Sequence, residues 1–300
     1  MAQIQVNHLT FYYEGNYEEL FSDVSFAIDT DWKLGFVGRN GRGKTTFLNL
    51  LMGKYEYRGS ISAPVHFEYF PFQVKDKSRM TIDIVEEMDP GYELWKLLRE
   101  INLMEMEPEL LYRPYDTLSN GERTRIMLAV LFTKEHSFLL IDEPTNHLDA
   151  EARQAVSRYL NKKSGFILVS HDRRFMDECV DHVLSLNKST IEVVQGNFTT
   201  WWDNKRQRDE WEAQENEKLK KEIGRLRESA RQTERWSDTV EKTKKGTKTG
   251  GLKPDRGYVG HKAAKMMKRS KSTESRMEKA VEDKEKLLKD VETAESLKII

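Results

Sequence analysis

Residues 38–45 read Gly38-Arg39-Asn40-Gly41-Arg42-Gly43-Lys44-Thr45 and follow directly on the apolar run 33–37. This stretch matches the Gly-x-x-x-x-Gly-Lys-Ser/Thr phosphate-binding loop at every fixed position. A helical pattern over residues 45–52 comes next, so the order is strand, glycine loop and helix. In such a unit, backbone N–H groups and the positive end of the helix face a phosphate. We therefore expect Lys44 to reach β- and γ-phosphates and Thr45 to offer its hydroxyl to Mg²⁺. The residues predicted to hold a nucleotide here are Gly38, Arg39, Asn40, Gly41, Arg42, Gly43, Lys44, Thr45 and Thr46.

A second motif lies about a hundred residues downstream. The apolar run 138–141 is followed by Asp142-Glu143-Pro144-Thr145-Asn146-His147-Leu148-Asp149. A buried strand that ends in two carboxylates can fix them where Mg²⁺ and water meet a γ-phosphate. Asp142 is expected to complete the contacts to the metal, and Glu143 to act as the base that activates water. Together, the two motifs predict an ATP-hydrolysing site.

The alternation of short apolar runs and helical patterns up to about residue 197 predicts an α/β fold with a largely parallel sheet. A helix is expected over 122–133, with strands over 33–37, 138–141 and 166–170. The alternating segments 3–9 and 24–28 predict antiparallel strands in a side sheet.

Composition narrows the class of protein. Of the 300 residues, 33% are charged, which is too polar for a wholly globular chain and predicts an extended part. No stretch approaches the roughly 18 apolar residues of a membrane span, and the first residues do not resemble a signal peptide. We expect a soluble, cytoplasmic protein. Cys179 is the only cysteine and is interpreted as a small buried apolar residue.

Charge is distributed unevenly along the chain. Residues 1–202 contain 22 Lys and Arg against 30 Asp and Glu, whereas residues 242–276 contain 12 against 2. So local an excess of positive charge favours a polyanionic partner, nucleic acid before membrane. The alternative is a solvated basic loop.

The last hundred residues carry a different pattern. Leu219, Ile223, Leu226 and Ala230 recur at the spacing of a narrow helical seam within residues 203–236, which contain almost no helix breakers. Glycines interrupt this pattern, and a second helical pattern starts near residue 261. The sequence predicts a long antiparallel helical hairpin over 201–300, with its basic tip around 242–276.

Residues 118–122, Leu118-Ser119-Asn120-Gly121-Glu122, stand at the start of a helical pattern twenty residues before Asp142. Ser119 and Gly121 could form a second anion site at a helix N-terminus, although an ordinary helix cap explains the same residues.

The order of phosphate loop, this string, Asp-Glu strand and His171 after a further strand resembles the nucleotide-binding domain of the ABC ATPase superfamily. The resemblance covers residues 1 to about 200 and implies an additional short helical subdomain. By this resemblance, residues 118–122 are the signature, Asp149 is the D-loop residue and His171 contacts the γ-phosphate. It also makes Tyr13, with Tyr12 as runner-up, the aromatic that stacks on adenine, and Gln73 the Q-loop residue near Mg²⁺ and water. Asn120 replaces a glycine of the usual signature, and asparagine tolerates left-handed backbone better than most residues.

Residues 144–149, together with a charged hairpin, resemble the ABC-F class of tandem ATPases that act on ribosomes. The chain then resembles the first nucleotide-binding domain, 1–200, plus the interdomain linker, 201–300. The remaining half of the ATP site is expected from a second ABC domain or from a head-to-tail copy of the chain.

The 44 residues between Gln73 and the signature leave little room for a long arm insertion. Together with residues 32–35, 38–44 and 264–271, this spacing resembles the Lsa-type resistance proteins. The resemblance implies ribosomal RNA and P-site transfer RNA as partners, and protection of the ribosome against lincosamides, pleuromutilins and streptogramin A. Two other interpretations remain: the ATPase subunit of a membrane transporter, and a module that binds nucleotide but hydrolyses little.

Overall fold

The computed structural model of the protein describes residues 2–15, 19–39, 41–187 and 190–243, together with isolated positions between 265 and 282. Contacts divide the chain into two compact units, Met1–Asp203 and Asn204–Ile300. The assignment of separate functions to residues 1–200 and 201–300 stays a prediction.

The first unit is built on a six-stranded sheet in the order β5-β6-β7-β3-β8-β9. Its strands are β3 (Lys33–Val37), β5 (His66–Phe70), β6 (Ser137–Asp142), β7 (Phe166–Val169), β8 (His182–Leu186) and β9 (Ile191–Gln195). All neighbours pair in parallel except β8 and β9, which are antiparallel. The predicted, largely parallel sheet is therefore confirmed, and its apolar runs fit strands that are covered on both faces.

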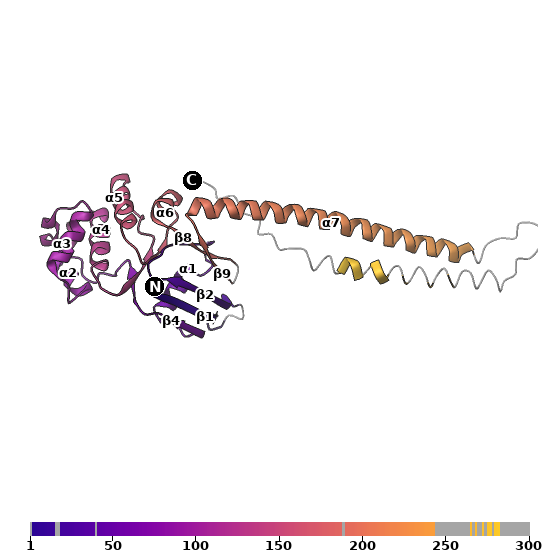
Figure 1. Ribbon diagram of the computed structural model, residues 1–300, viewed down its shortest axis with the longest axis horizontal. Helices are drawn as coiled ribbons and strands as arrows, with labels where there is room; N and C mark the ends of the chain where they lie inside the picture. Colours follow the sequence, from indigo (N-terminus) through magenta and orange to yellow (C-terminus); the bar gives the residue numbers. More distant parts are fainter. Residues whose placement is uncertain are drawn as a thin grey trace, which may run out of the picture. The chain divides into compact units, whose positions relative to one another are not determined.

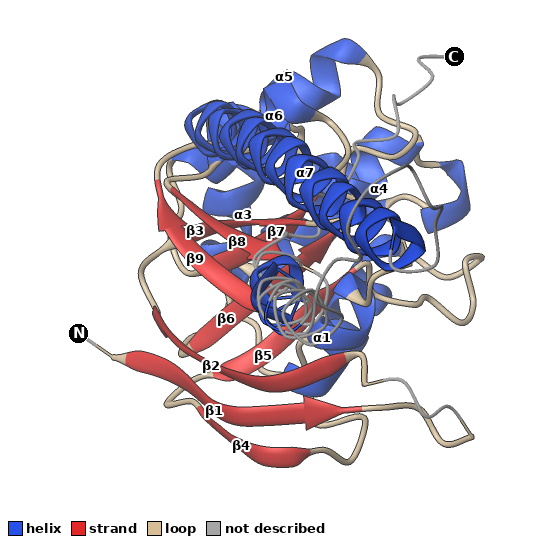
Figure 2. Ribbon diagram, turned by 90° about the vertical axis from the view of Figure 1, so that its right-hand side faces the viewer, coloured by secondary structure: helices blue, strands red, loops and turns tan. Residues whose placement is uncertain are grey.

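A smaller antiparallel sheet, in the order β2-β1-β4, lies beside the first (Figure 2). It consists of β1 (Gln3–Phe11), β2 (Phe21–Asp29) and β4 (Arg58–Ser62). The predicted antiparallel side sheet is confirmed, and β1 runs two residues beyond the predicted segment.

Helices of the first unit fall into two groups. Those that follow sheet strands are α1 (Lys44–Leu51), α5 (Ala150–Asn161) and α6 (Arg173–Cys179). Those of the helical subdomain, at one end of this unit in Figure 1, are α2 (Thr81–Met88), α3 (Leu94–Leu103), η1 (Pro108–Tyr112), η2 (Tyr115–Thr117) and α4 (Asn120–Leu131). The implied helical subdomain is thus present, and the helix expected over 122–133 starts two residues earlier.

Two apolar cores lie on the opposite faces of the six-stranded sheet. Successive residues of a strand alternate between them: Leu139 and Ile141 pack with the helical subdomain, α5 and α6, whereas Phe138 and Leu140 pack with α1 and the side sheet. This alternation follows from the two-residue period of a strand. Cys179 lies in the first core at 1% exposure, as predicted for a small apolar residue. The sheet edge that carries Asp142 is therefore held rigidly from both sides.

The helix α7 (Phe198–Thr243) contains 46 residues and includes the whole predicted segment 203–236. Ile223 is buried, and Leu219 and Leu226 are partly buried, as expected for an apolar seam. Among the described residues, no helix has both the length and the apolar composition needed to cross a membrane.

Several predictions fall outside the described residues. They concern Asn40, the side chain of Ala230, most of the basic tip 242–276 and most of the second helix expected after residue 261. The helical hairpin as a whole stays a prediction.

Candidate nucleotide-binding site

A cavity of about 370 Å³ lies where β3, β6 and β7 end. It is lined by Tyr13, Leu20, Gly41, Gly43, Lys44, Thr45, Thr46, Asp142, Glu143, Val169 and His171. The two motifs, a hundred residues apart in sequence, therefore meet at the carboxyl edge of one sheet, where ligands bind in open α/β folds.

The phosphate loop has the backbone that its glycines allow. Gly41 and Gly43 have φ of 75° and 98°, and Gly43 caps the N-terminus of α1. At Gly38 an added Cβ would lie 3.0 Å from Leu186 Cβ, so a larger residue would push β8 away. Gly38, Arg39 and Arg42 complete the loop but do not line the cavity.

Lys44 bridges the loop and the acidic edge of the cavity. Its Nζ donates to the Gly38 carbonyl at 2.8 Å. Burial lowers the pKa of Lys44, while the charges of Glu143 and Asp142 oppose that effect. One cation and two carboxylates share this region, so an anionic ligand would be attracted by Lys44 but would need a metal cation to offset Asp142 and Glu143.

The side-chain oxygens of Thr45 and Asp142 are hydrogen-bonded to each other. The Thr45 hydroxyl donates to Asp142 Oδ2 at 3.2 Å, and the Tyr69 hydroxyl donates to the same oxygen at 2.9 Å. Hydroxyl and carboxylate oxygens are the ligand types that Mg²⁺ prefers, and Mg²⁺ takes few of them from protein. In the described residues, no group of three His, Cys, Asp or Glu could hold a metal by itself. The donor set thus fits an Mg²⁺ ion shared with nucleotide phosphates.

Sequence reasoning missed Tyr69. It is the fourth residue of β5, which pairs in parallel with β6, so only the pairing of strands brings it to Asp142. Burial and the charge of Asp142 raise the pKa of Tyr69, which keeps the hydroxyl a hydrogen-bond donor.

Glu143 is held in a strained and partly desolvated position. Its φ of 51° lies in the left-handed region, which costs a non-glycine residue roughly 1–2 kcal/mol. Oε2 accepts from the His171 backbone N–H at 3.4 Å. Oε1 is buried without a hydrogen-bond partner among the described residues, and His171 Nε2 approaches it to 3.4 Å as an ion pair rather than a well-formed hydrogen bond. Burial raises the pKa of Glu143, and the charge of His171 opposes this. A carboxylate so placed can accept a proton.

Tyr13 rather than Tyr12 faces the cavity. The Tyr13 hydroxyl lies 2.6 Å from Thr46 Oγ1, and its ring packs edge-on against Phe11 and Tyr55. Tyr12 has the same exposed fraction, 43%, but lies near Arg58 and is not among the lining residues. The geometry therefore favours Tyr13 as the stacking aromatic.

Ser119 is engaged in a helix cap. Its hydroxyl accepts from the Glu122 N–H at 3.2 Å, and its own N–H donates to Glu122 Oε2 at 2.7 Å, which is a capping box. From the sequence, Ser119 could either cap a helix or contribute to an anion site. The cap is present, and the hydroxyl remains at a helix N-terminus.

The remaining residues assigned by resemblance also lie outside the lining of this cavity. Asp149 caps α5 by accepting from the Ala152 N–H at 2.8 Å. Gln73 is exposed in the loop after β5. Asn120 is the first helical residue of α4 and has no positive φ, so its tolerance of left-handed backbone, invoked from the sequence, is not needed.

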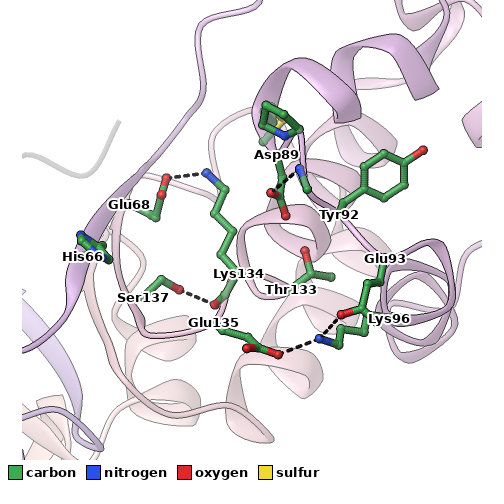
Figure 3. A pocket seen from close by; sticks show the side chains of 13 residues that line it. His66, Glu68, Asp89, Tyr92, Glu93, Lys96, Thr133, Lys134, Glu135 and Ser137 are labelled. Carbon is green, nitrogen blue, oxygen red and sulfur yellow. Dashed lines mark hydrogen bonds and ion pairs between the residues drawn. The ribbon is translucent and has the colours of Figure 1, made fainter.

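A second cavity, of about 420 Å³, lies at the opposite edge, where β5 and β6 begin. Its two lysines pair with glutamates: Lys134 with Glu68 at 2.9 Å, and Lys96 with Glu93 and Glu135 (Figure 3). It has no phosphate loop, and this mutual pairing makes it a poor site for an anion.

Comparisons with known proteins agree with this geometry. The family described as ABC transporter matches residues 21–146. A bacterial Atm1-family ABC exporter solved with ATP bound has the same fold, with a TM-score of 0.56 and 19% identity over 68% of this chain and 40% of that one. The matched residues and the cavity together define an ATPase domain of the ABC class.

Relatives of known sequence narrow the class. ATP-binding cassette sub-family F member 3 of Mus musculus is 30% identical over 202 residues, 65% of this chain and 28% of that protein. Ribosome protection protein VmlR of Bacillus subtilis is 28% identical over 272 residues, 90% of this chain and 46% of that protein. The chain is thus similar to proteins of ATP-binding cassette sub-family F and to a ribosome protection protein, and it spans less than half the length of these two relatives.

Proposed function

We propose that this chain binds ATP with Mg²⁺, hydrolyses it at a site shared with a second ABC domain, and acts on the ribosome. The observation that carries the catalytic part is that Lys44, Thr45, Asp142, Glu143 and His171 line one cavity. These are the residue types that phosphoryl transfer needs: a cation on the phosphates, oxygens for the metal, and a base for water.

Each residue has a distinct role in this proposal. Lys44 and the loop N–H groups hold the phosphates, while Thr45 and Asp142 hold Mg²⁺, which neutralises charge that develops on phosphate oxygens. Glu143 accepts the proton of the attacking water, because its pKa is raised by burial and one of its oxygens has no hydrogen-bond partner among the described residues. His171 contacts the γ-phosphate in this proposal and holds the Glu143 carboxylate in orientation, since its Nε2 lies 3.4 Å from Glu143 Oε1.

In this proposal, residues of a second domain complete the ATP site. Ser119 and Asp149 do not line the cavity that contains Lys44, so they serve the nucleotide of another domain. That domain is either a second ABC domain of a tandem protein or a head-to-tail copy of this chain. Tyr13 stacks on adenine, and Gln73 approaches Mg²⁺ when the two domains close.

Action on the ribosome is inferred from relatives and from charge. Similarity to a ribosome protection protein over 90% of this chain supports it, and so do the 12 Lys and Arg residues of 242–276. We propose that this basic segment approaches ribosomal RNA and P-site transfer RNA and thereby protects the ribosome from antibiotics of the Lsa spectrum. The transporter alternative is less well supported, because a polar 46-residue helix such as α7 serves no evident purpose in a transporter ATPase subunit.

One set of measurements tests the proposal. ATP turnover per molecule should rise with protein concentration, as expected for a shared site, and K44A should abolish nucleotide binding. Fast turnover by a demonstrated monomer would exclude the shared site, and binding without turnover at any concentration would favour the nucleotide-binding module. Co-sedimentation with ribosomes but not with membrane vesicles, in ATP, would separate the ribosomal from the transporter interpretation.

A further inference from the structure

The helical subdomain contains a carboxylate that is completely buried. Glu100 of α3 has 0% exposure, although a glutamate is among the residues least often buried. Its neighbours Leu97 and Ile101 belong to the apolar core. A charge in such surroundings is retained only where its partners compensate for lost hydration.

Those partners come largely from α5 and the residues just after it. Glu100 Oε2 accepts from the Tyr159 hydroxyl at 2.7 Å and forms a short ion pair with Lys163 Nζ. Oε1 accepts from Arg99 Nη2 at 3.0 Å, so both oxygens are satisfied. Burial opposes ionisation of Glu100, but the hydrogen bonds from Lys163 and Tyr159 hold its pKa below the ordinary value. We refer to Glu100, Tyr159 and Lys163 as the Glu100 cluster.

Two further contacts join the helical subdomain to α5. Glu105, just beyond α3, receives a forked ion pair from Arg158 of α5, with distances of 3.1 and 2.7 Å. Gly121 of α4 lies so close to Ala152 of α5 that an added Cβ would be 3.1 Å from the alanine Cβ. The subdomain is thus bound to α5 near both ends of that helix.

Two helices of this assembly begin at the residues that we propose to serve the other domain's nucleotide. Ser119 caps α4, and Asp149 caps α5. Buried ion pairs are weak sources of stability, because apolar replacements are often as stable, but they can fix one arrangement of packed elements. A fixed arrangement matters here, since misplacement by about 1 Å can cost about 10²-fold in rate.

Arg125 Nη1 of α4 donates to the carbonyl of Met104, the C-cap of α3, at 3.3 Å. We infer that Glu100 is a positioning residue: by joining α3 to α5, its cluster holds the signature helix α4, which is bonded to α3, and the D-loop helix α5 in register, so that Ser119 and Asp149 reach the second domain's nucleotide together. This inference rests on the shared site proposed above. The Glu100 cluster touches no nucleotide of its own domain, because none of its residues lines the cavity. Its effect should therefore fall on the partner's site.

Mixing variants tests this assignment. E100Q leaves Lys163 without its partner charge and could fail to fold, so E100M/Y159F/K163M, an apolar replacement of the whole cluster, is measured beside it. When a cluster variant forms the shared site with a second copy of itself, it should turn over ATP at least about tenfold more slowly than wild type. A loss of this size lies within the range that misplacement of catalytic groups causes. ATP affinity should stay within about twofold of wild type, because Lys44 and Thr45 are untouched.

In the decisive experiment, K44A protein is added to each cluster variant. The K44A protein lacks a working phosphate loop but has an intact Ser119 and Asp149. Turnover should return to that of a wild-type and K44A mixture, because the variant's own loop then meets an intact partner surface. No recovery, or wild-type turnover by the self-paired variants, would overturn the inference. The control E87Q removes a half-exposed ion pair with Arg79 in the same subdomain and should change neither quantity.

A second measurement does not depend on activity. Spin labels at Asn120 and Glu151, both exposed, report the separation of the starts of α4 and α5, and buried Cys179 is replaced by serine beforehand. The distance distribution should be narrow in the otherwise unchanged protein and in E87Q, and broader or displaced in the cluster variants. An unchanged distribution would overturn the inference. Absence of concentration-dependent turnover in wild type would instead refute the shared site, whatever the labels report.

Discussion

Tyr69 donates a hydrogen bond of 2.9 Å to Oδ2 of Asp142. The same oxygen accepts from Thr45, so one carboxylate oxygen is oriented by hydroxyls from β5 and from α1. The partner of a metal-binding carboxylate commonly sets its orientation and its affinity for the metal. Tyr69 thus links a strand outside both sequence motifs to the proposed Mg²⁺ site.

We predict that Y69F weakens Mg²⁺ binding without affecting the phosphate loop. Loss of an outer partner typically costs about 10–100-fold in metal affinity, so the Mg²⁺ concentration for half-maximal ATP turnover should rise by about tenfold. Affinity for ATP measured without Mg²⁺ should be unchanged. Y112F, which alters an exposed tyrosine of the helical subdomain, serves as the control. An unaltered Mg²⁺ requirement in Y69F would show that Thr45 alone orients Asp142.

Strands and loops of this site could be predicted because their signals are local. Apolar runs such as 138–141 and the glycine spacing of 38–45 are contiguous in sequence and require few other residues to be interpreted. Tyr69 lies 73 residues from Asp142, and its hydrogen bond depends on the parallel pairing of β5 with β6. Nothing local distinguishes it from other aromatic residues of a strand.

Glu143→Gln should preserve ATP binding and slow hydrolysis by about 10² to 10⁴, the usual cost of losing a positioned base. The chemical reason is that an amide has the shape of the carboxylate but cannot accept the proton of water. Single-turnover kinetics with the shared site assembled would measure this. E56Q, at an exposed position, is a suitable control. If E143Q retained most of its turnover, the base would have to be another group.

The pH dependence of wild-type hydrolysis provides an independent check on Glu143. Its pKa is raised by burial, so the carboxyl group takes up a proton at a higher pH than an exposed glutamate does. As pH falls through that raised pKa, the base is lost, and the turnover number should decline on the acid side earlier than an ordinary glutamate would require. E143Q should lack this acid-side decline in its residual activity.

Gly121→Ala is predicted to destabilise the domain through helix packing. Its new Cβ would lie 3.1 Å from the Cβ of Ala152, which is fixed in the core at 4% exposure. Overpacking of this kind costs about 1–3 kcal/mol. Urea unfolding of G121A, A152G and the double variant would test it, because removal of the facing methyl should restore part of the loss. Strictly additive effects would mean that the two positions do not press on each other.

Gly121 and Glu100 illustrate why the helical subdomain was harder to predict in detail. The sequence assigns Gly121 to a ligand, yet the close approach of α4 and α5 also requires a glycine there. Glu100, in a helix with Lys96 and Arg99 nearby, has the appearance of a solvated charge, and only the fold places Tyr159 and Lys163 beside it. Both features depend on contacts between helices far apart in sequence.

Arg173→Ala should loosen the start of α7 from α6. The Arg173 guanidinium lies 4.6 Å from the Trp202 ring centroid and 5.7 Å from that of Phe198. Such contacts contribute about 0.5–1 kcal/mol at exposed positions, so the free energy of unfolding should fall by about that amount. Urea unfolding followed by tryptophan fluorescence would measure it. R174A is the matched control, because Arg174 is 89% exposed and pairs with Glu178 of its own helix at 3.5 Å. Equal losses in both variants would argue against a specific role for the stacked guanidinium.

The basic segment 242–276 contains 12 Lys and Arg residues against 2 Asp and Glu. Each Lys or Arg that contacts a phosphate releases counterions, so affinity for RNA falls with salt in proportion to the number of contacts. Neutralising Lys262, Lys265, Lys268 and Arg269 to Gln together should weaken ribosome association and flatten its salt dependence. Nucleotide affinity should not change, because the phosphate loop is untouched, and any protection from antibiotics should be lost.

Ribosome co-sedimentation across a salt series, in a tandem protein that contains both ATP sites, measures this effect. The control neutralises four exposed charges of α7 instead, Lys218, Lys220, Lys221 and Arg225, so that net charge changes equally in both variants. If the salt dependence of ribosome binding flattened only in the variant of the basic segment, the phosphate contacts would belong to that segment. A general effect of net charge would flatten it in both variants. If neither slope changed, the segment would be solvated, and recognition of RNA would have to be sought elsewhere in the chain.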